Sequence, residues 1–404
     1  MGFHHGLSGL NAASKSLDVS GHNIANSNTI GFKKSRAEFN EMVASAMGSG
    51  QCPGSAGAGI GVSVAAVTQQ FSQGVITPTA NGLDMAINGD GFFVVNTPSG
   101  TAYTRNCAFQ LDKNGFLVTA NGDKVQGWAD ANATGTQPVD LQFPTGAGIP
   151  GRQTTGLAIQ AANLPATAPD AISVTPNTPR HTYGTSLQVY DSQGVAIPVE
   201  VYFVKNGSNT WDVYDSLDPA ATPVGQVQFD GEGKFVSSTV TGLNVDPSAA
   251  NPNNPPAPFN VTLDLIGMTQ NDRKWSVDKM TQDGYASGEL TGVNVSKDGT
   301  LMASYSNGLT RPEGKVALAR FTNPQGLAPS GNNNWVPTND SGVVVYGSAG
   351  AGSFGQIQGA ALEESNVDLT AELVEMMTAQ RSYQANAQTI KTQDQVFSTL
   401  VNLR

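Results

Sequence analysis

Apolar residues recur at spacings of three and four at both ends of the chain, which is the pattern of an amphipathic helix. Near the N-terminus the stripe consists of Phe3, Leu7, Leu10, Ser14, Leu17, Gly21 and Ile24. It predicts a helix with a heptad seam. Because Ser14 and Gly21 are small, this helix would bury little apolar surface by itself. Asn26, Ser27 and Asn28 follow directly, and these turn-forming residues predict its end.

A second stripe with the same spacing closes the chain. It consists of Leu369, Leu373, Met376, Gln380, Tyr383, Ala387, Ile390, Asp394, Phe397 and Val401. Asn366 and Asp368 are both suitable N-caps, and a helix start near Gln358 also fits the pattern. Either stripe alone is typical of a core helix in a globular domain. Since two matching seams flank β-type sequence, we expect them to pair as a two-helix coiled coil.

Between about residue 75 and residue 355 the pattern changes to β-strands, with no long helical periodicity. Phe92–Val95 predicts a buried strand, and Asn114-Gly115 and Asn121-Gly122 divide the alternating run 102–128 into hairpins. Further strand-like runs lie at 186–204, 209–216, 227–238, 288–308 and 315–323.

These patterns predict a mainly β fold with a terminal α-helical coiled coil. We expect a nested multidomain chain with two β domains plus a helical domain made from both termini. The helical assembly domain with its linker takes residues 1–70 with 358–404, the inner β domain takes 71–145 with 285–357, and the outer β domain is an insertion at 146–284.

Composition narrows the classes of partner. The 404 residues carry a net charge of −11, which argues against nucleic acid and against an anionic membrane surface. The charge is uneven, with +1 over residues 1–45 and −3 over residues 361–404. No run of 18 apolar residues occurs, so we expect no transmembrane helix and no membrane insertion. The N-terminus lacks the pattern of a cleaved signal peptide.

The sequence offers no catalytic constellation. Its two cysteines, Cys52 and Cys107, form no C-x-x-C motif, so we expect free thiols, with one long-range disulfide as the alternative. His4 and His5 have no third metal ligand near them in sequence. We therefore expect no enzyme activity, no cofactor and no metal site.

Several stretches resemble flagellar axial proteins of the rod and hook class. Residues 7–39 resemble the N-terminal signature of that class, residues 88–95 and 103–128 its first β domain, and residues 361–403 its C-terminal helix. The inserted block is similar to that of hook members at 187–214 and 321–342, whereas distal rod members are shorter and lack it. Cys52 and Cys107 are unusual in this class.

The resemblance implies a structural subunit that stacks helically into a short curved tube. In this class the tube is extracellular, joins the rod to the filament and transmits motor torque as a universal joint. The implied partners are further copies of the chain, the rod and hook–filament junction proteins, the hook cap and the flagellar type III export apparatus. The resemblance also implies export without cleavage and an N-terminus that orders on assembly. A distal rod subunit and a secreted β-rich adhesin are the alternatives.

The two seams and the turn between helix and β domain supply the candidate subunit contacts. These residues are Leu7, Leu10, Leu17, Ile24, Asn26, Asn28, Phe32, Leu369, Leu373, Met376, Tyr383, Ile390, Phe397 and Val401. Beyond the turn, the basic run that begins at Lys33 is expected to face acidic groups of a neighbouring subunit, with Glu363, Glu364 and Asp368 as candidates. A solvated basic face is the alternative.

An aspartate in the N-terminal seam tests its role in assembly. We expect Leu10→Asp or Leu17→Asp to leave a soluble, β-folded monomer and to abolish tube formation, because an unpaired buried carboxylate costs several kcal/mol in every subunit. Electron microscopy of the purified variants is the measurement. Normal tubes at the wild-type protein concentration would contradict the prediction.

Overall fold

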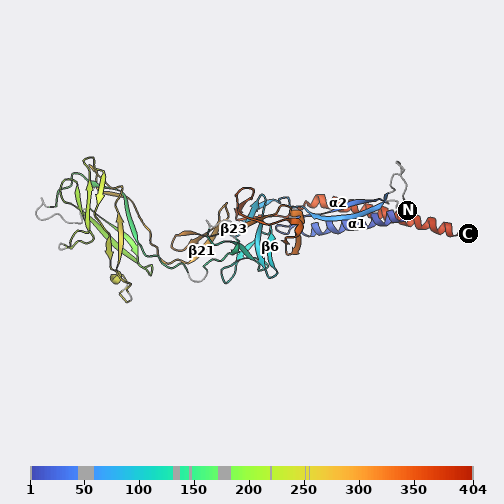
Figure 1. Cartoon of the computed structure of the whole chain (residues 1–404), viewed down its shortest axis with the longest axis horizontal. Helices are drawn as coiled ribbons and strands as arrows, with labels where there is room; N and C mark the ends of the chain where they lie inside the picture. Colours follow the sequence, from blue (N-terminus) through green and yellow to red (C-terminus); the bar gives the residue numbers. More distant parts are fainter. Residues whose placement is uncertain are drawn as a thin grey trace. The chain divides into compact units, whose positions relative to one another are not determined.

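The computed structural model describes residues 2–43, 59–130, 137–144, 148–171, 183–218, 221–250, 252–253 and 255–402. The chain forms two compact units. Unit 1 comprises Met1–Thr145, Gly292–Ser304 and Thr310–Arg404, and unit 2 comprises Gly146–Thr291 and Tyr305–Leu309 (Figure 1). The division of unit 1 into a helical and an inner β domain stays a prediction.

The two helices of unit 1 form at the two predicted stripes. Helix α1 (Gly2–Ala25) ends directly before Asn26, as predicted. Helix α2 (Leu369–Asn402) begins at the cap Asp368, whose Oδ1 accepts hydrogen bonds from the N–H groups of Thr370 and Ala371 at 2.9 and 3.2 Å. The helices lie side by side, and both chain ends are at the same end of the pair (Figure 1). The fold class is confirmed: mainly β, with the terminal helices packed together.

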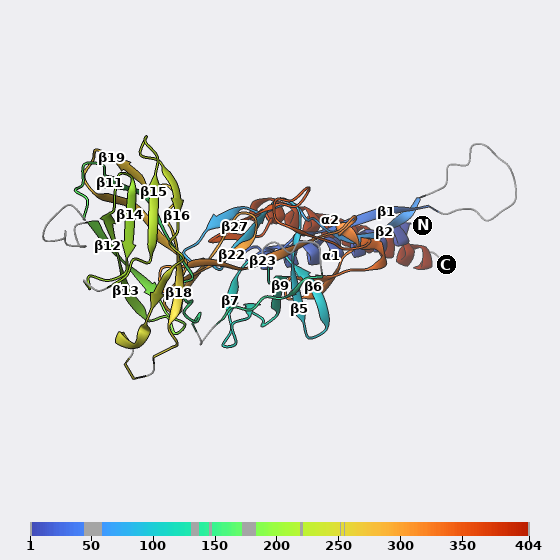
Figure 2. The ribbon, with the colours of Figure 1, turned by 60° about the vertical axis from the view of Figure 1, so that its left-hand side comes forward.

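A two-stranded antiparallel ribbon follows α1 and was not predicted. It consists of β1 (Ser35–Val43) and β2 (Gly59–Gln69), which pack against α1 (Figure 2). From the sequence, this part of the chain is expected to belong to the helical domain and its linker. The available signal was the alternation of Ala37 and Phe39 on one strand and of Val62 and Val64 on the other.

The main sheet of unit 1 has 12 strands, with the order β21-β22-β23-β9-β5-β6-β25-β24 along its path. The strands on the path are β5 (Phe92–Thr97), β6 (Gly100–Thr104), β9 (Lys124–Trp128), β21 (Leu290–Val295), β22 (Thr300–Tyr305), β23 (Thr310–Arg320), β24 (Ala328–Gly331) and β25 (Asn334–Val336). Strands β7, β8, β10 and β26 pair with members of the path or with one another. All four residues Phe92–Val95 are buried, as predicted.

Both predicted Asn-Gly turns are confirmed. Asn114-Gly115 joins β7 (Phe109–Leu111) to β8 (Leu117–Thr119), and Asn121-Gly122 joins β8 to β9. Gly115 and Gly122 have φ values of 82° and 88°, which favour glycine. Strand β10 (Val139–Asp140) extends the sheet beside β9, and β26 (Val345–Ser348) lies beside β23.

Two short strand pairs place the segment before α2 against the rest of unit 1. Strand β27 (Gln356–Gly359) pairs with β4 (Met85–Asn88), and β28 (Ala361–Glu363) pairs with β3 (Ile76–Pro78). The residues around Gln358 are therefore strand, and a helix start there is excluded. Short 3₁₀ turns occupy Pro324–Gly326 and Asn339–Ser341.

Unit 2 packs two five-stranded sheets over one core. Strands β12 (Gly184–Tyr190), β13 (Ala196–Lys205), β14 (Thr210–Tyr214), β15 (Gly225–Phe229) and β16 (Phe235–Ser238) form a meander in chain order. The other sheet comprises β11 (Gly156–Pro165), β17 (Leu243–Val245), β18 (Phe259–Asp264), β19 (Thr269–Asn271) and β20 (Ser276–Gln282), and a 3₁₀ turn lies at Pro247–Ala249. Trp211, Ile159 and Phe203 are among the core residues, each at most 1% exposed.

The two ends of unit 2 are paired with each other. Ile149 and Gly288 form an antiparallel bridge, as do Arg152 and Tyr285, with Arg152 N–H donating to Tyr285 O at 2.9 Å. A chain that enters and leaves at adjacent points is tolerant of excision.

We therefore expect unit 1 to fold when residues 149–288 are replaced by a short Gly/Ser linker. The hydrophobic cluster around Phe92, Trp128 and Trp335 consists of unit 1 residues, so the Tm should stay within about 4 °C of the parent value. Calorimetry of both proteins is the measurement. Loss of cooperative unfolding in the excised chain would contradict the prediction.

Candidate assembly site

Helices α1 and α2 meet through small residues of α1. The contact face carries Gly6, Gly9, Ala13, Ser16, Ser20 and Asn23, spaced three and four residues apart and all buried or half-buried. A Cβ at Gly6 would lie 2.9 Å from Ile390 Cγ1, and a Cβ at Gly9 would lie 2.8 Å from Asn386 Nδ2. At the other end of the antiparallel pair, Asn23 Nδ2 donates to Glu372 Oε2 at 3.3 Å. The small side chains let the two helices approach closely.

On α1 the predicted seam lies one position away from this contact, whereas on α2 the seam residue Ile390 takes part in it. The seam residues remain accessible to different degrees: Leu7, Leu369, Leu373, Tyr383 and Phe397 are exposed, while Leu10, Leu17, Ile24, Met376 and Ile390 are half-buried. Val401 belongs to α2, and its side chain lies outside those described. The helices pair as predicted, and α1 contributes to the contact the stripe of smaller residues one position away from its seam.

Exposed apolar side chains gather on α1, β1, β2 and α2, which we call the terminal elements. Of the 20 large hydrophobic side chains exposed in the described residues, 13 lie on these four elements. Phe397 on α2 is 60% exposed, Leu7 on α1 is 42% exposed and Phe39 on β1 is 39% exposed. Such a concentration is typical of a surface that binds another protein.

The turn after α1 is held by side-chain bonds. Asn26 Nδ2 donates to His22 O at 3.0 Å, and Thr29 Oγ1 donates to Asn26 Oδ1 at 3.2 Å. Phe32 is 7% exposed, with its ring edge-on to His22 at 5.6 Å between centroids. Asn28 is exposed. Of these three predicted site residues, Asn26 and Phe32 therefore shape the turn, and Asn28 faces solvent.

One buried carboxylate joins the turn to the segment before α2. Lys33 Nζ lies 2.6 Å from Glu363 Oε1, and Arg105 Nη1 lies 3.2 Å from Glu363 Oε2. All three side chains are buried, at 0%, 4% and 1% exposure for Lys33, Arg105 and Glu363. Gly74 N–H donates to Glu363 Oε1 at 2.9 Å, and Lys33 Nζ donates to Ser72 O at 2.8 Å. We call Lys33, Arg105 and Glu363 the junction triad.

The junction triad corrects the expectation for Lys33. Its predicted partner Glu363 is right, but the pair lies inside one chain and is fully buried, so Lys33 cannot face a neighbouring subunit. Burial lowers the pKa of the Lys33 ammonium, while the Glu363 carboxylate opposes that shift. Sequence analysis could not predict this burial, because the partners are 330 residues apart.

Cys107 completes the environment of the triad. Its Sγ accepts a hydrogen bond from Glu363 N–H at 2.9 Å, and the side chain is fully buried. Burial raises the pKa of the Cys107 thiol to about 12, so the thiol is neutral at physiological pH. Cys107 is a free cysteine, and Cys52 lies outside the described residues.

Two asparagines brace the same region. Asn23 bonds both backbone groups of Ser35, with Ser35 N–H donating to Oδ1 at 2.9 Å and Nδ2 donating to Ser35 O at 2.8 Å. Asn366 accepts from Lys34 N–H at 2.8 Å and donates to Gln70 O at 2.8 Å. These amides tie α1, the ribbon and the start of α2 together.

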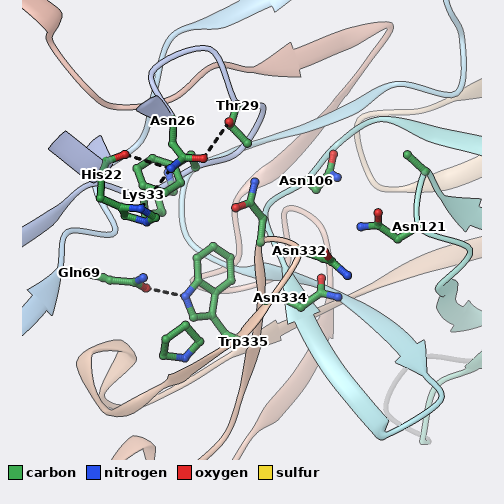
Figure 3. Close-up of a pocket in the computed structure, with 15 residues that line it drawn as sticks. His22, Asn26, Thr29, Lys33, Gln69, Asn106, Asn121, Asn332, Asn334 and Trp335 are labelled. Atoms are coloured by element: carbon green, nitrogen blue, oxygen red, sulfur yellow. Dashed lines mark hydrogen bonds between the residues drawn. The ribbon is translucent and has the colours of Figure 1, made fainter. Parts of the chain in front are cut away.

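A pocket of about 460 Å³ opens beside the turn (Figure 3). Its lining includes the amide side chains of Asn26, Gln69, Asn106, Asn121, Asn332, Asn333 and Asn334. Trp335 Nε1 donates to Gln69 Oε1 at 2.5 Å across its wall. Lys33 also lines the pocket, and its ammonium is paired with Glu363. The pocket therefore offers mainly amide groups, with the His22 imidazole beside them.

Within the described ranges, no group of three or more His, Cys, Asp or Glu residues could hold a metal ion. Neither helix, over its described residues, is long and apolar enough to cross a bilayer.

Four family models match the chain. They are the flagella basal body rod protein over residues 3–33, the flagellar hook protein FlgE/F/G D1 domain over 86–174, the flagellar basal body protein FlaE D2 domain over 159–285, and the flagellar basal body rod FlgEFG protein C-terminal over 358–403. Two of these models therefore cover the two terminal helices.

Full-length relatives agree with these models. The chain is 42% identical to flagellar hook protein FlgE of Escherichia coli strain K12 and 41% identical to that of Salmonella typhimurium, with 100% of both chains covered in each case. A crystal structure of Helicobacter pylori flagellar hook protein FlgE2 is similar in fold, with a TM-score of 0.50 and 15% identity over 71% of this chain and 100% of that one.

Gly31 is the position where the junction leaves no room for a side chain. Its φ is +69°, and a Cβ would lie 2.4 Å from Arg105 O. We expect Gly31→Ala to lower the free energy of unfolding by about 2 kcal/mol or more. Gly21→Ala is the control, because a Cβ there meets nothing within 4 Å. It should stabilise α1 by about 0.5–1 kcal/mol. Denaturant titrations of both variants are the measurement. Equal changes in the free energy of unfolding would contradict the account of the turn.

The buried thiol of Cys107 predicts a loss of stability at alkaline pH. Its pKa is about 12 in the folded chain and 9.0 in the unfolded reference, so the folded state retains a proton that the unfolded state loses. The stabilisation is present below pH 9 and falls above it, by up to about 1.4 kcal/mol per pH unit. Denaturant titrations of wild type and Cys107→Ala between pH 8 and 11 should therefore converge or cross. A constant difference would contradict the prediction.

Proposed function

Because this chain belongs to the family of flagellar hook proteins FlgE and is a structural subunit of the hook, we propose that its copies polymerise through the terminal elements. The observation that carries the proposal is the concentration of 13 of 20 exposed large hydrophobic side chains on α1, β1, β2 and α2. Burying apolar surface is the main favourable term in protein association. A polymer buries these side chains in every subunit.

The geometry of the helix pair supports the proposal that the predicted seam contacts neighbouring subunits. The small residues of α1 satisfy the contact within the chain, and this leaves Leu7, Leu373 and Phe397 unburied beside it. In a tube, seams of neighbouring copies would bury one another. The fourteen residues named from the sequence are accordingly proposed as assembly residues, with Asn26 and Phe32 acting through the shape of the turn.

We also propose the wider set of partners that the family resemblance implies. These are the rod and hook–filament junction proteins at the two ends of the tube, the hook cap during growth and the flagellar type III export apparatus. The match of residues 3–33 and 358–403 to rod-type models supports a terminal contact surface of the kind used by rod proteins. Export without a cleaved signal peptide, to a hook outside the cell, is part of the same proposal.

The transmission of torque follows from how the parts of unit 1 are connected. The segment before α2 is paired with other parts of unit 1 in the two-stranded sheets β27–β4 and β28–β3, and the junction triad connects it to Lys33 beyond α1 and to Arg105 at the end of β6. A force on the helix pair therefore reaches the sheet through buried, bonded contacts. The distal rod and adhesin alternatives lose their support, since hook proteins match the chain over its full length.

Polar substitution of exposed seam residues tests the proposal. Leu7→Asp and Leu373→Asp should change the free energy of unfolding by less than about 0.5 kcal/mol, because both side chains are exposed. Each should raise the critical concentration for tube formation by about tenfold or more, since the carboxylate would be buried between subunits. Sedimentation and electron microscopy are the measurements.

Val343→Asp is the matched control, because Val343 is 82% exposed on unit 1 and lies outside the terminal elements. It should assemble like the wild type. If the control is as impaired as the two seam variants, or if all three assemble normally, the terminal elements are not the assembly surface.

A further inference from the structure

The junction triad contains one anion for two cations. Glu363 contacts Lys33 through Oε1 and Arg105 through Oε2, and all three side chains are buried. Arg105 Nη2 also donates to Gly89 O at 2.8 Å, while its Nε is buried without a hydrogen-bond partner among the described residues. The charge of the cluster is therefore balanced only in part, and it depends on Glu363.

Two members of the triad come from opposite ends of the chain, and the third comes from the sheet. Lys33 follows α1, Glu363 precedes α2, and Arg105 follows β6 in the sheet. The backbone of Glu363 adds to the connection, because its carbonyl accepts from Gly31 N–H at 2.8 Å. Glu363 thus connects the segment after α1 and the segment before α2 to Arg105 at the end of β6.

Removing Glu363 would leave the rest of the cluster in an unfavourable state. Without Glu363, the side chains of Lys33 and Arg105 would be two like charges in a dry site, and an uncompensated buried charge is strongly destabilising. Without Lys33, Glu363 retains Arg105, so charge is balanced one to one. Loss of the Glu363 carboxylate should therefore destabilise the cluster more than loss of the Lys33 ammonium.

We propose that Glu363 is an interlock that makes docking of the two terminal segments mutually dependent. Residues 31–34 dock on the sheet only when Glu363 is seated, and the start of α2 is held in turn by the bonds it makes to that docked segment. Asn366 with Lys34, and Asn23 with Glu372, extend the same dependence along the helix pair. Both helices are then presented together or not at all.

This inference rests on the proposed function and adds a condition that a subunit must meet before it can assemble. A chain with one end missing or misplaced would not hold the other end in position, so it would present no complete assembly surface. Incomplete subunits would thereby be excluded from the tube. Glu363 is a positioning residue in this account, because it acts through the segments that carry the assembly surface.

Full-length variants distinguish a charge interlock from simple packing. Glu363→Gln keeps the shape of the side chain and removes its charge, and Lys33→Met keeps most of the length and removes a cation. Glu364→Gln is the control, since Glu364 is the exposed neighbour in sequence. Critical concentrations for tube formation and hydrogen exchange of the resulting tubes are the measurements.

We expect Glu363→Gln to raise the critical concentration by at least tenfold and Lys33→Met to change it by less than threefold. Adding Lys33→Met to Glu363→Gln should lower the critical concentration again by threefold or more, because one of the two unpaired cations is gone. In the Glu363→Gln tubes, the rate of amide hydrogen exchange should increase in both residues 2–43 and residues 364–402. It should stay unchanged in residues 92–128. If Glu363→Gln forms no tubes, recovery of tubes in the double variant decides the question.

The interlock is refuted if the double variant is as impaired as Glu363→Gln, or if only one terminal segment gains exchange. Failure of the wild type and of Glu364→Gln to form tubes would instead refute the proposed function. In that case the free energies of unfolding of the same variants test the interlock. We expect Glu363→Gln to be the least stable, the double variant to be more stable than Glu363→Gln, and Lys33→Met to be closest to the wild type.

Discussion

The carboxylate of Glu363 is the point on which unit 1 depends. It pairs with Lys33 beyond α1 and with Arg105 beyond β6, and its own backbone bonds Gly31 and Cys107. A buried ion pair contributes little net stability, but leaving one of its members unpaired costs several kcal/mol. The arrangement therefore specifies how the chain ends are placed more than it strengthens the fold.

The terminal elements make contacts within the chain and, in the proposed function, contacts between chains, and they use different residues for each. Small residues on α1 provide the contact within the chain, as Gly6 against Ile390 illustrates. Larger apolar residues such as Leu7 and Phe397 remain exposed in the single chain, where we propose that they contact neighbouring chains. A helix that used Leu7 to bind its own partner helix would have less apolar surface to offer a neighbour. In the proposed function, the seam is weak within one chain because its larger side chains are used between chains.

Sequence periodicity predicted the elements better than their surroundings. The three- and four-residue spacing gave both helices, Asn26 marked the end of α1, and Asn114-Gly115 marked a hairpin, because each signal is local. The burial of Lys33 could not be predicted, since it depends on Glu363 from the other end of the chain. On α1 the helix contact uses the smaller residues beside the seam, whereas on α2 the seam residue Ile390 takes part. Hydrophobicity identifies an apolar face but not the partner that covers it. The ribbon β1–β2 was missed although its alternation was present.

The central claim is that subunits join through the seam beside the helix pair while the junction triad stays intact within each chain. A cryo-electron microscopy reconstruction of assembled tubes at side-chain detail tests it most directly. The account predicts that Leu7, Leu373 and Phe397 are buried between neighbouring copies and that Lys33, Arg105 and Glu363 of one chain remain in contact. Tubes in which those three apolar side chains face solvent, with the subunit contacts made by unit 2 alone, would contradict it.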